Sequence, residues 1–312
     1  MSKPIHAVKH SRGDNHTWPG HTGNWGRWSD DRGTMNLLTP EATLRGIESV
    51  RDGTVYPISW PLHPNDGTNY FEVPAYEHEM MHVTDGTGFM QDAGDRIAAR
   101  QHGLANTHID ALGHVGLRDK AFNGHLWVDV AAQSGLLKMD ITAQQGIVTR
   151  GVLIDVPRLR GVSSLTAGEV VHADEIAQGL EAIQPGDAVL IRLGNDWRAT
   201  LDDPDAQPDH NGFLFGLPGL HTDVVDLIAA YDGALIGTDC SADVLPATDP
   251  DFRGPIHMLT TAVYGMSLIH NLRLDQLSSA CAKEDRWTFL FTVGPINLVG
   301  ATGSLVSPLA VM

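Results

Sequence analysis

The amino-acid sequence predicts an α/β (mixed α+β) fold, and three observations carry this prediction. Short apolar runs, typical of buried strands, alternate along the chain with amphipathic segments that are typical of helices. No internal repeat and no linker interrupts this alternation. The 312 residues, 42% of them hydrophobic, are enough to bury a sizeable core. We therefore expect one domain over residues 25–312, preceded by a polar arm over residues 1–24.

Helices are predicted from their end signals and from their amphipathic pattern. Thr39-Pro40-Glu41 is a typical helix start, with threonine as the N-cap, proline at the first helical position and an acid in the first turn. This helix should run to about Arg51, because Gly53 follows it. Other helical patterns cover residues 173–183, 218–231 and 274–282, and residues 96–100 are expected to form a short helix.

Strands are predicted where β-branched, aromatic or continuous apolar residues gather. Residues 54–60 are β-branched and aromatic. Residues 151–156 and 188–193 are continuous apolar runs, as in strands that are covered on both faces. Shorter strand patterns cover residues 234–237 and 287–293, and residues 198–216 form a long loop rich in aspartate and proline.

The charge and composition exclude several classes of partner. The formal charge is −17, from 38 acidic and 21 basic residues, which argues against nucleic acid and against anionic membrane surfaces. No apolar segment reaches the roughly 20 residues of a membrane helix, and the N-terminal residues have no apolar core of a signal peptide. Cys240 and Cys281 are the only cysteines, so we expect no disulfide framework, no thiolate metal cluster and a cytoplasmic location.

The stretch from Leu104 to His114 contains the main candidates for metal binding and proton transfer. If residues 107–111 are extended, His108 and Asp110 point to the same face, because side chains alternate along a strand. Gly113 permits a tight turn that can bring His114 back toward that face. An imidazole and a carboxylate side by side can hold zinc or manganese, and a second imidazole could move protons. The alternative is a turn aspartate and two buried histidines bonded to the backbone, which the spacing alone slightly favours.

A second histidine pattern is interpreted as a chance match. His78-Glu79-x-x-His82 matches the zinc-protease motif, which requires a helix. Pro74 lies just upstream and Gly86 just downstream, so any helix here has about two turns. The sequence also lacks a Gly-x-Ser-x-Gly elbow, a phosphate loop and a dinucleotide-binding glycine motif, so nucleotide-dependent and serine-hydrolase activities have no support.

Several motifs, taken in order, resemble the metal-dependent cyclase family, which includes kynurenine formamidase and isatin hydrolase. Asn106-Thr-His108-Ile-Asp110-Ala-Leu-Gly-His114 is similar to the family signature His-x-Gly-Thr-His-x-Asp-x-Pro-x-His. Other matching stretches are Asn24-Trp-Gly-Arg-Trp28, Gly33 to Pro40, Arg150 to Asp155, Gly186 to Ile191, Gly237-Thr-Asp239, Pro255-Ile-His257 and Gly303 to Val311. The longer members, which act on lactones and related ring compounds, look most similar. The resemblance implies a swivelling β/β/α fold.

Carried over position by position, the resemblance implies roles for five residues. His108, Asp110 and His257 look like metal ligands, and His114 looks like the proton-transfer residue. His270 falls where the family has a bridging glutamate, and it is interpreted as a ligand, an outer hydrogen-bond donor or a core histidine.

Two departures from the family signature change the predicted metal site. Leu104 stands where the family has its first histidine, and His270 replaces a carboxylate. Three imidazoles and one carboxylate suit one Zn²⁺ or Mn²⁺ rather than a pair, which normally needs bridging carboxylates. His102 would share a strand face with Leu104 and could replace the missing histidine. Complete loss of the metal is the alternative.

The resemblance implies a hydrolase that cleaves a lactone, a cyclic amide or a related acyl bond of a small ring substrate by means of metal-bound water. Trp25, Trp28 and Phe213 are expected to line the substrate pocket, although core packing explains them nearly as well. Thr238 and Asp239 could orient a ligand histidine or cap a turn. A homodimer or homotetramer is expected. The alternatives are a lyase or isomerase on the same scaffold, or a metal-free homologue without catalytic activity.

Overall fold

The computed structural model describes residues 23–62, 76–84, 86–180, 183–194, 216–245, 247 and 254–312. Over these ranges strands and helices alternate around a central sheet, which confirms the predicted mixed α/β class. Residues 1–22 of the predicted polar arm and Phe213 in the predicted long loop lie outside the described residues. No helix in the described part is both long and apolar enough to span a membrane.

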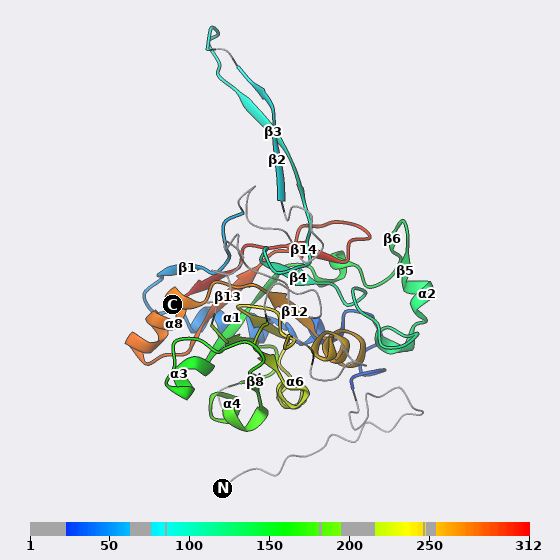
Figure 1. Ribbon diagram of the computed structural model, residues 1–312, viewed down its shortest axis with the longest axis vertical. Coiled ribbons are helices and arrows are strands. Elements are labelled where there is room, and N and C mark those ends of the chain that lie inside the picture. The colour runs from blue at the N-terminus through cyan, green and yellow to red at the C-terminus, as the bar shows by residue number, and fades with distance from the viewer. Residues whose placement is uncertain are drawn as a thin grey trace.

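A curled sheet of nine strands forms the centre of the molecule (Figure 1). In sheet order the strands are β1 (Val55–Pro57), β15 (Leu309–Val311), β13 (Thr288–Val293), β7 (Ile147–Asp155), β9 (Ala188–Arg192), β11 (Leu235–Thr238), β12 (Ser267–His270), β4 (His108–Asp110) and β14 (Gly303–Leu305). The four middle strands, β7, β9, β11 and β12, are parallel, whereas the other strands pair antiparallel. The antiparallel pair β12–β4 carries the histidines considered below.

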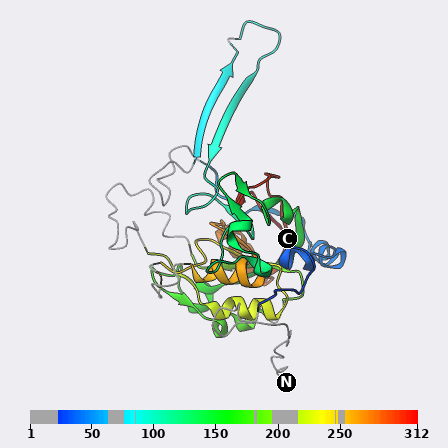
Figure 2. The same ribbon diagram turned by 90° about the vertical axis from the view of Figure 1, so that its right-hand side faces the viewer.

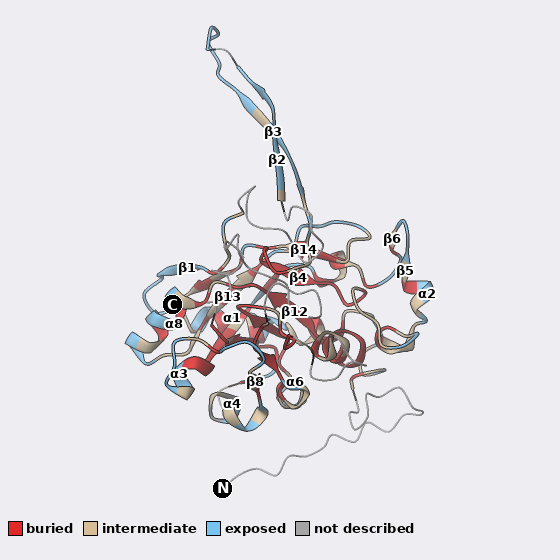
Figure 3. Cartoon of the chain, in the orientation of Figure 1, coloured by how far each residue is buried: buried red, intermediate tan, exposed pale blue. Residues whose placement is uncertain are grey.

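The sheet separates two hydrophobic cores, because successive side chains of each strand point to opposite faces. In β9, Leu190 belongs to one core and Val189 to the other, and both are fully buried. Three helices, α3 (Val156–Arg160), α4 (Ala173–Leu180) and α6 (Thr222–Ala230), add side chains to the core of Val189 and lie together beside the sheet. Helix α8 (Asp275–Glu284) adds Leu277 to the core of Leu190. Figure 3 shows the buried residues concentrated in these layers.

The predicted strands 151–156, 188–193, 234–237 and 287–293 are confirmed as β7, β9, β11 and β13, and the helices 173–183 and 274–282 as α4 and α8. The helix predicted from Thr39 is α1 (Pro40–Glu48), where the Thr39 hydroxyl accepts a hydrogen bond from the Ala42 amide at 3.3 Å. The helix predicted over 218–231 starts later, at Thr222, because Gly219–Leu220 (β10) pairs instead with Val170–Val171 (β8).

Smaller elements complete the fold. These are helices α2 (Trp127–Val130) and α7 (Pro255–His257), a π-helix over Met258–Tyr264, 3₁₀ turns over Gly33–Leu37, Phe122–Gly124 and Ile141–Gln144, and the strand pair β5 (Ala131–Ala132) and β6 (Gly135–Leu136). The π-helix follows α7 directly and ends at Gly265, whose φ of 62° is in the left-handed region that favours glycine.

The short helix predicted over residues 96–100 is wrong. This segment belongs to β3 (Ala93–Ala99), which pairs antiparallel with β2 (Tyr76–Val83) in a separate hairpin. The pairing of β2 with β3 places the His78-Glu-x-x-His82 pattern on a strand. His78 bonds to Asp95 at 2.8 Å and His82 to Asp92 at 3.1 Å. The pattern is therefore a chance match to the zinc-protease motif, as predicted.

Candidate metal centre

Two neighbouring strands present three of the predicted residues on one face of the sheet. In β4, Ile109 points into a hydrophobic core, so His108 and Asp110 point to the opposite face, as the alternation along a strand predicts. Strand β12 pairs antiparallel with β4, and its register sets His270 opposite His108. All three side chains are buried, and Asp110 is completely inaccessible to solvent.

A third element brings His257 to the same place. His257 ends the short helix α7, and its Nε2 lies 3.5 Å from Asp110 Oδ2. The other ring nitrogen, Nδ1, donates a short hydrogen bond to the Asp243 carboxylate. Asp243 also accepts a hydrogen bond of 2.7 Å from the Ile256 amide, so it holds the start of α7 as well as the ring. Asp243 thereby fixes the tautomer of His257 that leaves Nε2 facing Asp110.

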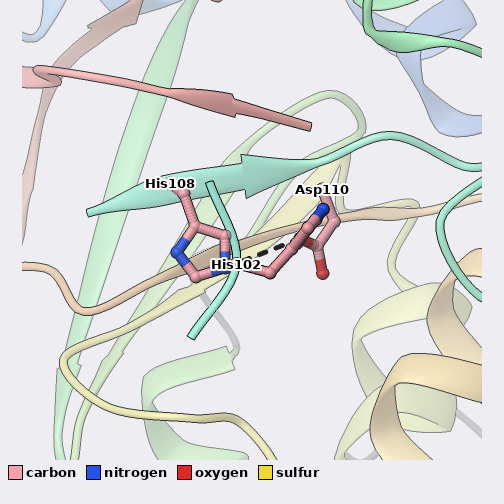
Figure 4. A group of neighbouring side chains, drawn as sticks. All are labelled: His102, His108 and Asp110. Carbon is pink, nitrogen blue, oxygen red and sulfur yellow. Dashed lines mark ion pairs between the residues drawn. The ribbon is translucent and has the colours of Figure 1, made fainter. Parts of the chain in front are cut away.

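Four imidazoles face the two oxygens of Asp110. On one side, Oδ1 lies 3.0 Å from His102 Nδ1 and 3.6 Å from His108 Nε2. On the other side, Oδ2 lies 3.1 Å from His270 Nε2 and 3.5 Å from His257 Nε2. Figure 4 shows His102 and His108 approaching the carboxylate from two segments of the chain. Each half of the carboxylate thus forms a three-donor group that could hold a metal ion.

The nitrogens on the outer edges of these rings have fixed partners. His108 Nδ1 donates to the Asn106 carbonyl at 2.8 Å, and His102 Nε2 lies 2.8 Å from the Thr302 hydroxyl. Together with the bond from His257 to Asp243, these contacts direct one nitrogen of each of three rings at Asp110. Protein histidines that bind metals are held in this way by a partner on the other ring nitrogen.

The charges at the centre also suit a cation. Burial by itself raises the pKa of Asp110, but the imidazoles of His114, His270 and His102 outweigh burial and hold this pKa well below its usual value. Burial lowers the pKa of His108 far below its usual value and also lowers that of His270, so both imidazoles are neutral at neutral pH and could coordinate a cation. Burial also lowers the pKa of His257, but Asp243 more than offsets it and raises the pKa to about 9.

The donor set fits a divalent cation. An ionised carboxylate without solvent contact needs a compensating positive charge. The described residues that line the cavity above Asp110 include neither lysine nor arginine. Without a metal, the protonated His257 beside Asp110 supplies that charge. A divalent cation could replace it once His257 has lost the proton on Nε2, and the imidazole and carboxylate donors suit zinc or manganese.

His114 lies beside this ring of donors. Its imidazole stacks on that of His102, with ring centroids 3.6 Å apart and planes 3° apart. Its ring centroid is 6.3 Å from that of His257. Burial lowers the pKa of His114 to about 3, so the side chain is neutral at neutral pH. His114 therefore has the position and the charge state of a proton acceptor next to the donors.

A cavity of about 260 Å³ opens over the centre. The histidines described above form its base, and its walls include the apolar side chains of Leu104 and Leu245 and the hydroxyl-bearing Ser241. The cavity has room for a small molecule and would bring it against both His114 and the imidazoles that surround Asp110.

The tryptophans predicted to line the pocket lie elsewhere. Trp25 packs against the core of Leu190, and its Nε1 donates to the Ala262 carbonyl at 2.6 Å. Trp28 packs against the same core and lies under the Arg27 guanidinium at 4.6 Å. Neither is among the described residues that line the cavity, and Phe213 lies outside the described residues. Their contact with substrate stays a prediction.

The sequence missed one residue of the centre and named another only as an alternative. Asp243 precedes His257 by 14 positions in a loop, with no motif to mark it. The sequence raised His102 only as a possible replacement for the missing histidine, because strand register could not be assigned. Asp239, which the family motif suggested as a partner of a ligand histidine, instead accepts hydrogen bonds from the amides of Leu193 and Gly194.

Comparisons with known proteins identify the family and the fold. The Cyclase family model, described as "Putative cyclase", matches residues 34–243. A search of curated proteins finds no match. Among solved structures, a novel cyclase superposes with a TM-score of 0.80 at 24% identity, covering 94% of this chain and 100% of that chain.

Two further structures have the same fold at greater distance. Isatin hydrolase A from Ralstonia solanacearum gives a TM-score of 0.57 at 20% identity, covering 83% of this chain and 92% of that chain. A predicted metal-dependent hydrolase from Bacillus stearothermophilus gives 0.50 at 17% identity, covering 83% of this chain and 98% of that chain. Because the family model matches most of the chain, and a cyclase structure superposes over nearly all of it, the chain belongs to the Cyclase family, as its motifs predicted.

Proposed function

We propose that the protein is a metal-dependent hydrolase that opens a lactone, a cyclic amide or a related acyl bond in a small ring substrate. One observation carries the proposal. A fully buried aspartate is surrounded by four imidazoles, each with a nitrogen directed at it, at the base of a cavity that also contains a neutral histidine. Family membership supports the same activity class.

In this proposal Asp110, His108, His257 and His270 would hold the metal, with His102 as a fifth donor. When bound there, a divalent cation such as Zn²⁺ or Mn²⁺ supplies Lewis acidity, which lowers the pKa of water and polarises an acyl carbonyl. Asp243 keeps His257 in the tautomer whose Nε2 can coordinate. Asn106 does the same for His108 through its backbone carbonyl.

His114 moves the proton. As a neutral imidazole it accepts a proton from the attacking water, and it then donates that proton to the oxygen or nitrogen that leaves the acyl carbon. The ring of His102 stacked beside it holds the His114 imidazole in one orientation.

The size and lining of the cavity support a small ring substrate. Leu104 and Leu245 offer apolar contact to the faces of a ring, whereas Ser241 can hydrogen-bond to a polar group on its edge. The name of the Ralstonia solanacearum neighbour points to isatin, which is a cyclic amide. We extend this substrate class to the present chain as part of the proposal.

The test is a hydrolysis screen of lactones, cyclic imides and N-formyl aromatics with zinc-loaded and manganese-loaded protein. We expect His114→Ala to keep its metal content and to lose roughly 10²–10⁴-fold in turnover, because one proton-transfer residue contributes about this much. His125→Ala is the matched control, since this histidine lies outside the cavity and pairs with Asp31. Labelled solvent water should appear in the product.

Three outcomes would contradict the proposal. Full turnover by His114→Ala would remove this residue from the mechanism. A product without solvent oxygen would indicate a lyase or an isomerase. Protein that binds neither zinc nor manganese, and shows no activity when either is added, would indicate a homologue without catalytic activity.

A further inference from the structure

Two histidines and an aspartate meet on the surface of the molecule, where two short strands end. His172 follows β8 and His221 follows β10, and these strands pair in parallel. The register sets the two histidines side by side, because each is the next residue of its strand. Their ring centroids are 4.5 Å apart. Asp223, in the first turn of α6, completes the group, which we call the surface cluster.

The surface cluster is separate from the metal centre described above. Helix α4 begins directly after His172, and α6 begins directly after His221. In two perpendicular views (Figures 1 and 2), these helices lie at the end of the molecule opposite the β2–β3 hairpin. None of the three side chains is among the described residues that line the cavity over Asp110. The proposed hydrolase activity therefore leaves the surface cluster without a role.

One carboxylate oxygen lies next to both imidazoles of the cluster. Asp223 Oδ2 is 3.2 Å from His172 Nδ1 and 3.1 Å from His221 Nδ1. Tetrahedral zinc holds nitrogen and oxygen ligands at about 2.0–2.2 Å, which places two such ligands roughly 3.3–3.6 Å apart. All three donor atoms lie within 4.8 Å of one another. Small movements of the side chains would therefore place them around one cation.

Backbone amides hold two of the three donors in place. Asp223 Oδ1 accepts a hydrogen bond from the Ala173 amide at 3.1 Å, which leaves Oδ2 directed at the imidazoles. His221 caps α6, and its Nδ1 accepts a hydrogen bond from the Asp223 amide at 3.3 Å. A ring nitrogen that accepts a hydrogen bond carries no proton, and this is the form that binds a metal. The bond to the amide is long, so a cation could readily replace it.

The charge and the exposure of the cluster also favour a cation. In the ion pairs between described residues, Asp223 has the two histidines as its only partners, so neither lysine nor arginine neutralises it there. The formal charge of −17 on the whole chain attracts cations. The side chains of His172, His221 and Asp223 are 48%, 47% and 41% exposed. A cation can therefore enter from solvent, and water can complete its coordination.

We propose that the surface cluster is a second metal site, which binds one divalent transition cation such as Zn²⁺ through His172, His221 and Asp223. Imidazole and carboxylate donors suit zinc. When the cation binds, His172 releases to solvent the proton that its Nδ1 donates to Asp223, since a ligand nitrogen must be unprotonated. The bound cation cross-links the start of α4 to the start of α6.

The cross-link lies next to the backbone that supports the cavity. Leu220, the residue before His221, donates a hydrogen bond from its amide to the Ala242 carbonyl at 2.9 Å. Ala242 precedes Asp243, whose carboxylate holds the imidazole of His257. A cation at the surface cluster therefore fixes the end of β10, against which the segment that carries Asp243 is hydrogen-bonded.

The experiment counts the zinc bound to the full chain by equilibrium dialysis against micromolar free Zn²⁺, followed by metal analysis. Wild type should hold one zinc ion per chain more than His172→Ala or Asp223→Asn. His82→Ala is the matched control, because this histidine is also about half exposed and pairs with a single aspartate, Asp92. The difference does not depend on the hydrolase proposal, since a failure of the centre at Asp110 to bind zinc would lower all four counts equally.

Circular dichroism establishes that each variant is folded, and Asp223→Asn keeps an oxygen that can accept the hydrogen bond from the Ala173 amide. Equal zinc in wild type and in either cluster variant would overturn the proposal. Loss of the same zinc ion in His82→Ala would also overturn it, because zinc would then bind exposed histidines without selection. Zinc should raise the unfolding temperature of wild type more than that of His172→Ala, since a cation bound to the folded state stabilises it. An equal rise would exclude the cross-link.

Discussion

The position of His102 bears on how the centre tolerates its departure from the family signature. Leu104 stands where the signature has histidine, and its side chain lines the wall of the cavity. Two positions earlier, His102 reaches Asp110 Oδ1 at 3.0 Å and is anchored to Thr302 on its other nitrogen. A donor lost at one position is therefore available from the same segment of chain, so the carboxylate keeps its full ring of imidazoles.

This arrangement predicts the effect of His102→Ala. If His102 is a ligand, its removal should weaken zinc binding by at least 10- to 100-fold, which is the effect of losing even an outer partner of a metal ligand. Competition with a chelator of known affinity measures the change. Leu104→Ala is the control, because it alters the same wall of the cavity without removing a donor. The double variant His102→Ala/Leu104→His should recover part of the affinity. Unchanged affinity in His102→Ala would exclude it as a ligand.

The sequence predicted only part of this centre, because some of its contacts are local along the chain and others join distant segments. Alternation along a strand relates His108 to Asp110 locally, and the structure has this relation. His257 and His270 come from distant segments, and only the resemblance to a family put them near Asp110. His102 and Asp243 depend on the path of loops, for which a single sequence has no periodic signal.

At the scale of elements, buried strands and capped helices were predictable, whereas short and exposed strands were not. The continuous apolar runs of β7 and β9 contain no turn residues that would contradict a strand. Thr39 caps α1, as the sequence Thr39-Pro40-Glu41 indicates. Strand β12 has only four residues and follows a π-helix, so no periodicity marks it. Strand β3 was mistaken for a helix because its exposed face does not show the alternation of a half-buried strand.

The ends of two parallel strands are joined by one buried carboxylate. Asp239 follows β11 and accepts hydrogen bonds from the amides of Leu193 at 2.8 Å and Gly194 at 3.0 Å, just beyond the end of β9. Burial raises the pKa of Asp239 from 3.8 to about 7. The folded state thus favours the protonated carboxyl more strongly than the unfolded chain does.

This pKa predicts a pH-dependent stability that Asp239→Asn should remove. A group whose pKa is raised on folding contributes stability that is complete below its unfolded pKa and is lost as the pH rises through its folded pKa. The free energy of unfolding of the wild type, relative to Asp239→Asn, should therefore fall between about pH 4 and pH 7 by up to roughly 4 kcal/mol. Urea denaturation of both proteins across this range measures the difference. A difference that does not vary with pH would contradict the assignment.

At the scale of the whole molecule, one sheet connects two cores. Strands β7, β9 and β11 each place alternate side chains in the core of Leu190 and in the core of Val189. Loss of packing on either face removes support from the same backbone, so neither core should unfold while the other stays intact. The metal centre lies on strands of this same sheet, and its geometry therefore depends on both cores.

Ile176→Ala tests whether the two cores unfold together, because it changes one core while the tryptophans pack against the other. Ile176 is fully buried in α4 in the core of Val189, so its truncation should cost about 2–4 kcal/mol. Trp25, Trp28, Trp127 and Trp287 pack against the other core and report on it by fluorescence. In urea, the unfolding midpoints measured by fluorescence and by circular dichroism should fall by the same amount, because the strands shared by the two cores make them unfold together. Ile47→Ala, at a half-exposed position, should leave both within about 0.5 kcal/mol of wild type. A shift in circular dichroism without one in fluorescence would mean that the two cores unfold independently.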